Sequence, residues 1–409
     1  MAVGQEFSLN TYRYAVFVSL LYQPYLRGNN RMKISKSLKI AAAALALSLF
    51  AVTPAFSVGL TGAGATFPQP LLDACKAGFA EATGHSFTYG AGGSGTGRGN
   101  SDKGVGDINF SDTAHKATTK VATVIHVPVV AAPVAVLYNL PNKSKTLNLS
   151  AATLAGIFAG TITKWNDPAI VADNNRSIKT IIYRKNADGT VKRDAKGQPI
   201  VLRTDVRTVY YTLPSQSIKV VYRSDSSGTQ GNFTAFLNGA APTVWTKAGN
   251  NAFPSTFPGN LNDPANLGRI TGASGSAGVA VQAGKTPYSI TFAEPSYAKA
   301  QKLQLANIQN AAGNFQAPDA AGTSAFLAAG TVDANGFIDF NYKTTVAGAY
   351  PLGIVSYALV DTKNANATAI KSFLNYLLSS KCVSLLPDFA LIGGDLLAIN
   401  QKQIAKITG

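Results

Sequence analysis

The sequence predicts a folded α/β protein with largely parallel sheets and enough chain for two domains. Short runs rich in β-branched and aromatic residues alternate along the chain with apolar-faced segments of helical length. The composition is 46% hydrophobic and only 14% charged, which is typical of a folded protein. A length of 409 residues is enough for two domains.

The expected elements follow the chain in order. In the first half they are a helix over Leu71–Thr83, a strand over Phe87–Tyr89, an extended apolar run over Ile125–Leu140, and a helix over Ala151–Phe158 with Ser150 as its cap. In the second half they are strands over Ile218–Tyr222, Ser289–Ala293 and Pro351–Val360, and helices over Gly231–Leu237 and Thr368–Leu378. Asn186–Gln198 is expected as a surface hairpin and Asn250–Asn266 as a loop.

The N-terminal region has the pattern of a secretory signal. Met32 is followed by three lysines, then by the uncharged 13-residue run Ile40–Val52, and then by small residues up to Ser57. We therefore expect 32–57 to be a signal peptide cleaved after Ser57 and 1–31 to be an upstream extension. The alternative is one long membrane anchor, although the run is too short to span a bilayer. Cleavage would leave Val58 first, which disfavours a lipid anchor.

The net charge stays positive without this segment. The chain has 36 Lys/Arg and 20 Asp/Glu, and residues 1–57 hold six and one of these, so 58–409 carries a net charge of +11. A basic surface favours anionic partners without identifying one. Most of the positive charge is equally explained as ordinary solvated surface charge. The low charged fraction and the abundance of Gly, Ser, Thr and Asn indicate a secreted or periplasmic protein rather than a nucleic-acid binder.

The chain has two cysteines, Cys75 and Cys382. An even number behind a signal peptide permits one disulfide, which would tie the N-terminal region to the C-terminal helix. Two buried free thiols are the alternative.

The segment Lys219–Gln230 is the most informative part of the chain. It reads as a strand that ends in a tight turn and opens a helix, with Ser227 and Thr229 as cap-type residues around Gly228. The start of a helix offers unpaired N–H groups and a partial positive charge, and Arg223 adds a planar fork of donors. This stretch therefore predicts part of a site for a small tetrahedral anion.

Other tracts combine glycine with small polar residues. These are Thr61–Phe67, Gly92–Gly99 and the segment Asp107–Asp112, which ends on a carboxylate. An ordinary turn explains any one of them alone. Catalytic signatures are weak: the Gly90–Gly95 match to a dinucleotide fingerprint lies in a longer glycine tract, and Gly284-Lys285-Thr286 lacks the first glycine of a P-loop. The three histidines have no metal-ligand spacing and are expected to be structural.

With these motifs in this order, the chain resembles the phosphate-binding proteins of the high-affinity phosphate ABC transporter, the PstS family. The similarity is strongest over Thr61–Pro68, Tyr89–Gly97, Ile108–Thr113 and Leu213–Thr229. The resemblance implies a phosphate site with no catalytic residue, metal or cofactor. Its ligand set comprises Thr66, Phe67, Ser94, Asp112, Arg223, Ser227, Gly228 and Thr229, with Asp225 holding Arg223.

Asp112 is the residue that would select the ligand. A carboxylate beside an anion is favourable if phosphate keeps a proton to donate to it, whereas sulfate has no such proton at neutral pH and would leave two acceptors facing each other. Asp112 as a helix cap is the alternative.

The resemblance also implies the fold, a two-lobed periplasmic binding protein fold (type II) in which two sheets flanked by helices are joined by a strand hinge. We expect one lobe over 58–136 and 346–409 and the other over 137–345, with a basic insert at about 175–212 that short family members lack. The expected protein is a periplasmic monomer that captures inorganic phosphate and delivers it to ABC permease membrane subunits. A secreted phosphatase on the same fold and a binding protein for another oxyanion are the alternatives.

Overall fold

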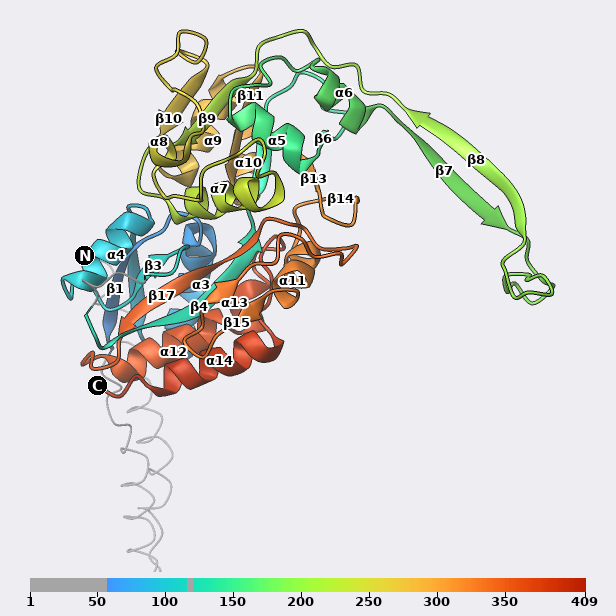
Figure 1. Cartoon of the computed structure of the whole chain (residues 1–409). Coiled ribbons are helices and arrows are strands. Elements are labelled where there is room, and N and C mark those ends of the chain that lie inside the picture. Colours follow the sequence, from blue (N-terminus) through green and yellow to red (C-terminus); the bar gives the residue numbers. More distant parts are fainter. Residues whose placement is uncertain (1–56, 116–120) are drawn as a thin grey trace, which may run out of the picture. The chain divides into compact units, whose positions relative to one another are not determined.

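The computed structural model describes residues 57–115 and 121–409. The expected upstream extension, and the expected signal peptide apart from Ser57, lie outside the described residues. Residues 57–409 form one compact unit built around two five-stranded sheets (Figure 1). In the described part of the chain, no helix combines the length and the apolar character needed to cross a bilayer.

The first sheet has the strand order β2-β1-β3-β17-β4. Its strands are β1 Gly59–Gly64, β2 Ser86–Ala91, β3 Asn109–Ser111, β4 Val124–Pro133 and β17 Gly353–Asp361. β1 pairs in parallel with β2 and β3, whereas β17 runs antiparallel to β3 and β4. The helices that neighbour its strands in sequence are α3 Gln69–Thr83, α4 Ser94–Asp102, α12 Ala367–Leu377, α13 Ser380–Val383 and α14 Gly394–Ala405.

The second sheet has the order β10-β9-β11-β5-β12. Its strands are β5 Ala135–Tyr138, β9 Lys219–Arg223, β10 Ile270–Ala273, β11 Ser289–Ala293 and β12 Gln304–Leu305. β9 is parallel to β10 and β11, and β5 is antiparallel to β11 and β12. The accompanying helices are α5 Ala151–Phe158, α6 Pro168–Asn174, α7 Gly228–Ala240, α8 Phe253–Thr256, α9 Gly275–Lys285 and α10 Ser296–Gln301.

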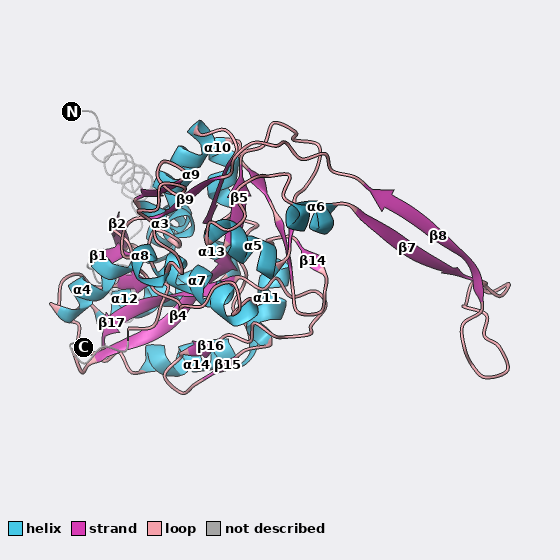
Figure 2. Ribbon diagram, turned by 45° about the horizontal axis from the view of Figure 1, so that its top comes forward, coloured by secondary structure: helices cyan, strands magenta, loops and turns pink. Residues whose placement is uncertain are grey.

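The described residues also form three smaller sheets. One joins β14 Phe315–Gln316, β13 Asn307–Gln309 and β6 Asn148–Leu149, and another joins β15 Thr331–Val332 to β16 Ile338–Asp339, which follow helix α11 Ala320–Ala328. The third is the hairpin of β7 Arg176–Tyr183 and β8 Val201–Val209, and Figure 2 shows its two strands extending away from the helices. A surface hairpin is thus present where the turn residues predict one.

The predicted α/β class with two sheets flanked by helices is confirmed. The chain passes from the first sheet to the second between β4 and β5, which are separated only by Val134, and both strands are almost wholly buried. The expected lobe limits stay a prediction. However, α11 contacts β17 and β4 of the first sheet, so we propose that the second crossing lies before Ala320 rather than near residue 346.

Local propensity explains most elements. Ser150 caps α5, as predicted, by accepting from the backbone N–H of Thr153. The expected helix and strands over 71–83, 87–89 and 289–293 are present with limits close to those expected. Two segments contain a helix where a turn or loop is expected. The helix α4 begins at Ser94 within the glycine tract at 92–99. The short helix α8 lies within the expected loop at 250–266.

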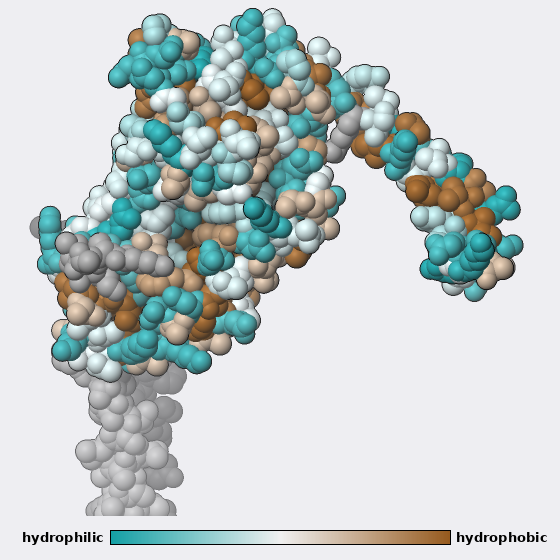
Figure 3. Space-filling view, viewed as in Figure 1, coloured by the Kyte–Doolittle hydropathy of each residue, from teal (hydrophilic) through white to brown (hydrophobic). Residues whose placement is uncertain are grey.

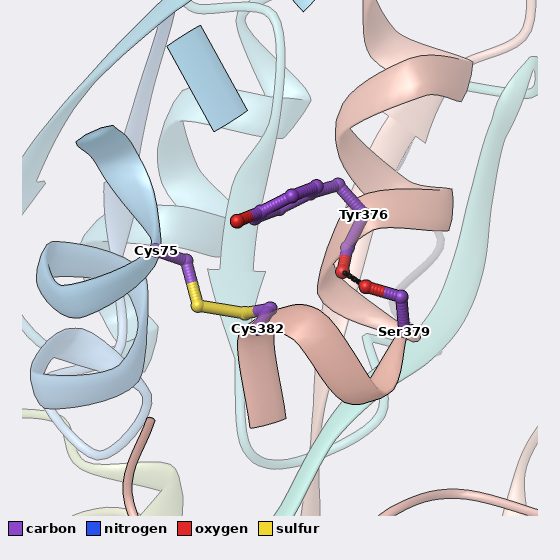
Figure 4. Close-up of a disulfide and its surroundings, with 4 residues drawn as sticks. All are labelled: Cys75, Tyr376, Ser379 and Cys382. Atoms are coloured by element: carbon purple, nitrogen blue, oxygen red, sulfur yellow. Dashed lines mark hydrogen bonds between the residues drawn. A yellow bond between two sulfur atoms is a disulfide. The ribbon is translucent and has the colours of Figure 1, made fainter. Parts of the chain in front are cut away.

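Cys75 and Cys382 form a disulfide that joins α3 to α13 (Figure 4). Their Cα atoms are 5.3 Å apart across a sequence separation of 307 residues, and both side chains are fully buried. The pairing excludes the alternative of two free thiols in this structure. It ties the first helix of the unit to a C-terminal helix that packs on it.

Candidate functional site

The segment Arg223–Thr229 forms the strand-turn-helix unit that the sequence predicts. Arg223 is the last residue of β9, and Ser227 is the N-cap of α7. The Ser227 hydroxyl oxygen accepts from the backbone N–H of Gln230 at 3.1 Å. A hydroxyl that accepts in this way keeps its own proton to donate. The N–H groups of Gly228 and Thr229 lie in the first turn of α7, where intrahelical acceptors are missing.

Arg223 is buried and held rigidly by its neighbours. Its side chain donates through Nε to one carboxylate oxygen of Asp225 at 2.7 Å and through Nη2 to the other at 2.5 Å. Burial alone would raise the pKa of Asp225, but its hydrogen bonds and ion pair with Arg223 outweigh this and lower the pKa. Asp225 therefore fixes the guanidinium plane and remains charged.

The third anchor of Arg223 lies on another helix. Nη1 donates to the Ser276 hydroxyl at 3.2 Å, and Ser276 is in the first turn of α9. Ser276 in turn contacts Thr66 from the other sheet: its backbone N–H donates to Thr66 Oγ1 at 3.0 Å, and the two hydroxyl oxygens are 2.9 Å apart. Tyr297 donates to the Thr66 carbonyl at 2.9 Å. The turn after β1, which carries Thr66 and Phe67, is thus bonded to the second sheet.

Asp112 follows β3 and is buried opposite the start of α7. Its carboxylate accepts from the hydroxyls of Thr229 and Ser356, each at 2.8 Å, and its backbone N–H donates to Ser94 Oγ at 3.1 Å. Burial raises the pKa of Asp112 to about 6, although the hydrogen bonds from Ser356 and Thr229 and the charge of Arg223 oppose the shift. The contact to α7 is made across the two sheets, so Asp112 is more than a local cap.

Segments of the two sheets approach each other closely at Gly228. A Cβ atom on this residue would lie 2.6 Å from Ser94 Oγ and 2.9 Å from both the Asp112 backbone nitrogen and Cβ. Contacts below 3.0 Å do not occur without displacement of a neighbour. Only glycine therefore lets the start of α7 approach Ser94 and Asp112 this closely.

A second cross-sheet cluster lies beside this contact. Arg98 of α4 donates to Thr113 Oγ1 at 3.2 Å and approaches Ser226 Oγ at 3.5 Å. With the Asn251 amide oxygen turned toward it, both Nη groups donate to that oxygen, at 3.1 and 2.9 Å. We refer to Arg98, Thr113, Ser226 and Asn251 as the Arg98 cluster. It joins the first sheet's helix to two loops of the second.

The structure brings predicted ligand residues from both sheets together between them, with Ser94, Asp112, Gly228 and Thr229 in contact and Thr66 linked to Arg223 through Ser276. The predicted residues come from four segments: the β1–α3 turn, the start of α4, the end of β3 and the β9–α7 unit. The side chains of the predicted set are at most 5% exposed where a fraction is given, and Asp225, which holds Arg223, is 14% exposed. The anion-binding role of each residue stays a prediction.

Sequence reasoning missed Ser276, Ser356 and the Arg98 cluster. For Ser276 a signal was available, because Ser274-Gly275-Ser276 follows β10 and opens α9 in the same way that Ser227-Gly228-Thr229 follows β9. Ser356 lies inside an apolar strand, where nothing in the pattern marks it. The Gln230 side-chain nitrogen is also buried and has no hydrogen-bond partner among the described residues.

The histidines within the described residues are structural contacts. His115 Nε2 lies 2.7 Å from an Asp102 carboxylate oxygen, and its backbone N–H donates to His126 Nε2 at 3.0 Å. Over 57–115 and 121–409, no three His, Cys, Asp or Glu side chains are grouped so that they could hold a metal ion.

The fold and the buried polar cluster between two sheets define a two-lobed binding protein. The family model described as a PBP superfamily domain matches residues 51–381. Phosphate-binding protein PstS 3 of Mycobacterium tuberculosis is 34% identical over 309 residues, which cover 71% of this chain and 70% of that protein. Phosphate-binding protein PstS of Pasteurella multocida is 30% identical over 288 residues, 70% of each chain. The chain therefore belongs to the PstS family of phosphate-binding proteins.

Solved structures share the fold at lower sequence identity. An ancestral soluble variant of the human phosphate binding protein superposes with a TM-score of 0.61 at 22% identity, covering 84% of this chain and 93% of that one. The phosphate-bound periplasmic protein PfluDING gives a TM-score of 0.60 at 22% identity, covering 85% and 93%. Both support the two-lobed fold.

Proposed function

We propose that this protein captures inorganic phosphate between its two lobes and delivers it to an ABC permease. The observation that carries the proposal is the convergence of Arg223, the α7 start and Asp112 from opposite sheets at one buried place. The curated relatives that resemble it are named phosphate-binding proteins, which supports the same ligand.

The donors match a small oxyanion. An anion removed from water is costly to bury unless its oxygens are hydrogen-bonded. Among the described residues, Arg223 donates three of its five N–H groups to Asp225 and Ser276, which leaves two for a ligand. The Ser227 hydroxyl and the first N–H groups of α7 add donors, and the helix dipole favours negative charge there.

Asp112 discriminates between phosphate and sulfate. A carboxylate in the site accepts a hydrogen bond only from a ligand that carries a proton, which phosphate does and sulfate does not at neutral pH. An unprotonated oxyanion would face the carboxylate with acceptor against acceptor, at a cost of about 1–3 kcal/mol or more. The raised pKa of Asp112 allows the proton to be shared between the carboxylate and the ligand.

Binding would favour the closed arrangement of the lobes. Thr66, Ser94 and Asp112 belong to segments of the first sheet, and Arg223 to Thr229 belong to the second. A ligand contacts both sets only when they are close, so it stabilises that state through its differential contacts. An extracytoplasmic location, a cleaved signal peptide and a monomeric state complete the proposal. No catalytic step is required of these residues.

Titration calorimetry of residues 57–409 with phosphate and with sulfate tests the proposal. We expect one phosphate per chain and no measurable heat from sulfate at the same concentration. Equal affinity for the two anions would contradict it. A phosphomonoester hydrolysis assay on the same preparation, with and without added divalent metal, would reveal the phosphatase alternative.

A further inference from the structure

The hairpin of β7 and β8 is a surface without a partner in the described chain. Its strands pair only with each other, and in both ribbon views it runs clear of the other sheets and helices (Figures 1 and 2). From Ser177 to Thr208 nearly every residue is exposed. Isolated two-stranded hairpins are marginally stable in water, so a hairpin this long is expected to function against another surface.

The hairpin concentrates the positive charge of the protein. Residues 176–209 contain nine Lys/Arg and three Asp, a net charge of +6. Residues 58–409 together carry +11, so about a tenth of the chain holds more than half of the net charge. The tip alone, 184–200, contributes five of the basic residues and two of the acidic ones. This concentration favours an anionic partner over a second, equally basic copy of the hairpin.

The hairpin also exposes apolar side chains on one face. Alternate residues of a strand share a face, and directly paired residues of antiparallel strands lie on the same side. The pairs Ile181–Thr204, Tyr183–Val201 and Lys179–Val206 therefore share one face, which we call the apolar face because four of its six residues are apolar or aromatic: Ile181, Tyr183, Val201 and Val206. Val206 is 59% exposed and Ile181 48%. Figure 3 shows hydrophobic surface along the strands and hydrophilic surface at the tip.

The opposite face mixes charged and apolar side chains. Arg203 and Arg207 lie there, paired with Ile182 and Ile178, and Arg203 forms an exposed ion pair with Asp205 at 3.0 Å. The strands thus offer exposed apolar groups, mainly on one face, while the tip concentrates cations. This arrangement fits the boundary of a lipid bilayer, where apolar side chains enter the acyl region and Lys and Arg reach anionic headgroups.

We propose that the β7–β8 hairpin docks the protein on an anionic phospholipid membrane. The apolar face contacts the acyl boundary, and the lysines of the tip contact the headgroups. Nucleic acid would use the cations but leaves the apolar face uncovered, and a second copy would cover the apolar face but brings together two charges of +6. Lipid is the partner that uses both features.

Vesicle sedimentation tests the proposal with residues 57–409, which form one compact unit and lack the apolar N-terminal run. The probes are vesicles of phosphatidylglycerol mixed with phosphatidylcholine and vesicles of phosphatidylcholine alone. We expect binding to be at least about tenfold stronger on the anionic vesicles and to weaken as salt is added. Deletion of residues 177–208, closed by a short glycine linker, should abolish it.

Two multiple-substitution variants separate the contribution of the tip charges from that of the apolar face. Replacing Lys185, Lys192 and Lys196 by Gln should weaken binding about tenfold or more, and Ile181→Ser with Val206→Ser should weaken it several-fold. The matched control replaces three exposed lysines of the body, Lys343, Lys363 and Lys381, by Gln. Phosphate calorimetry on every variant verifies the fold.

Three outcomes would overturn the proposal. One is equal binding to both vesicle types. Another is an equal loss of vesicle binding in the body-lysine control, which would show that binding depends on the net charge of the protein and not on the hairpin. The third is vesicle binding that the hairpin deletion leaves unchanged. Concentration-dependent dimerisation that the deletion abolishes, without vesicle binding, would instead assign the hairpin to a second copy.

Discussion

The Thr229 hydroxyl donates a hydrogen bond of 2.8 Å to the Asp112 carboxylate, so the start of α7 on one sheet is joined to the end of β3 on the other. The second oxygen of the same carboxylate accepts from Ser356. Asp112 is thus a junction between the lobes as well as the expected selector of the ligand. Both roles lead to predictions.

Asp112→Asn should reduce the preference for phosphate over sulfate. The amide donates as well as accepts, so it no longer requires a proton on the ligand, and sulfate loses its unfavourable contact. Removing this unfavourable contact, which costs about 1–3 kcal/mol, should raise the affinity for sulfate relative to phosphate by roughly 5- to 150-fold. Competition calorimetry measures the ratio. An unchanged ratio would show that Asp112 does not select the ligand.

The stability of the ligand-free protein should fall as the pH rises from about 4 through about 6. Burial raises the folded-state pKa of Asp112 to about 6 from an ordinary 3.8, so in this window the folded chain holds a proton that the unfolded chain has released. Stability therefore decreases with pH there. Denaturant unfolding of the wild type and Asp112→Asn at several pH values measures the difference.

The control for this measurement is internal. Burial also raises the pKa of Glu294, to about 7, and Glu294 is present in both proteins. Only the part of the pH dependence that Asp112→Asn removes belongs to Asp112. Identical curves for the two proteins would mean that Asp112 is not buried as a carboxyl group in solution.

Gly228→Ala should keep the lobes apart. Its new Cβ would lie within 3.0 Å of Ser94 and Asp112, so closure would require the two sheets to separate. We expect at least about a tenfold loss of phosphate affinity, equal to about 1.4 kcal/mol, and a larger radius of gyration in phosphate by small-angle scattering. Gly99→Ala is the matched control, because a Cβ there meets nothing within 4 Å. Equal behaviour of both variants would contradict the prediction.

Arg98→Ala should speed the release of phosphate. Arg98 joins the lobes through Ser226 and Asn251, and losing a charged hydrogen-bonding group of this kind costs about 1.5–3 kcal/mol when buried and less when half-buried. Stopped-flow measurements should show the dissociation rate rising by about tenfold while association changes little. Lys103→Ala removes an exposed charge at the end of the same helix and should leave both rates unchanged.

Local sequence patterns predicted the elements but not the way they meet. The β-branched run Lys219–Arg223 and the cap residue Ser227 determine a strand and a helix start through interactions within about ten residues. The same holds for Ser150 and α5. The capped start of α7 could be predicted from these residues because helix capping is a local effect, whereas its role in anion binding stays a prediction.

The partners of that site could not be predicted in the same way. Ser356 reaches Asp112 across 244 residues, and Ser276 reaches Thr66 across 210. Such contacts depend on the strand order of the two sheets, which no single segment encodes. In the glycine tract at 92–99, local propensity disfavours the helix that the structure contains. Tertiary packing overrides this propensity, because Gly97 lies against the backbone of Gly64 and Phe110, where a side chain would not fit.

The disulfide between Cys75 and Cys382 makes the chain a covalent ring that encloses the hairpin. A protease that cuts one exposed Lys–X bond at the hairpin tip opens the ring without releasing a fragment, since the two pieces stay linked by sulfur. We expect limited trypsin digestion to give one band on a non-reducing gel and two on a reducing gel, with phosphate binding retained by the nicked molecule. Two bands without reductant would show that the ring is open in solution.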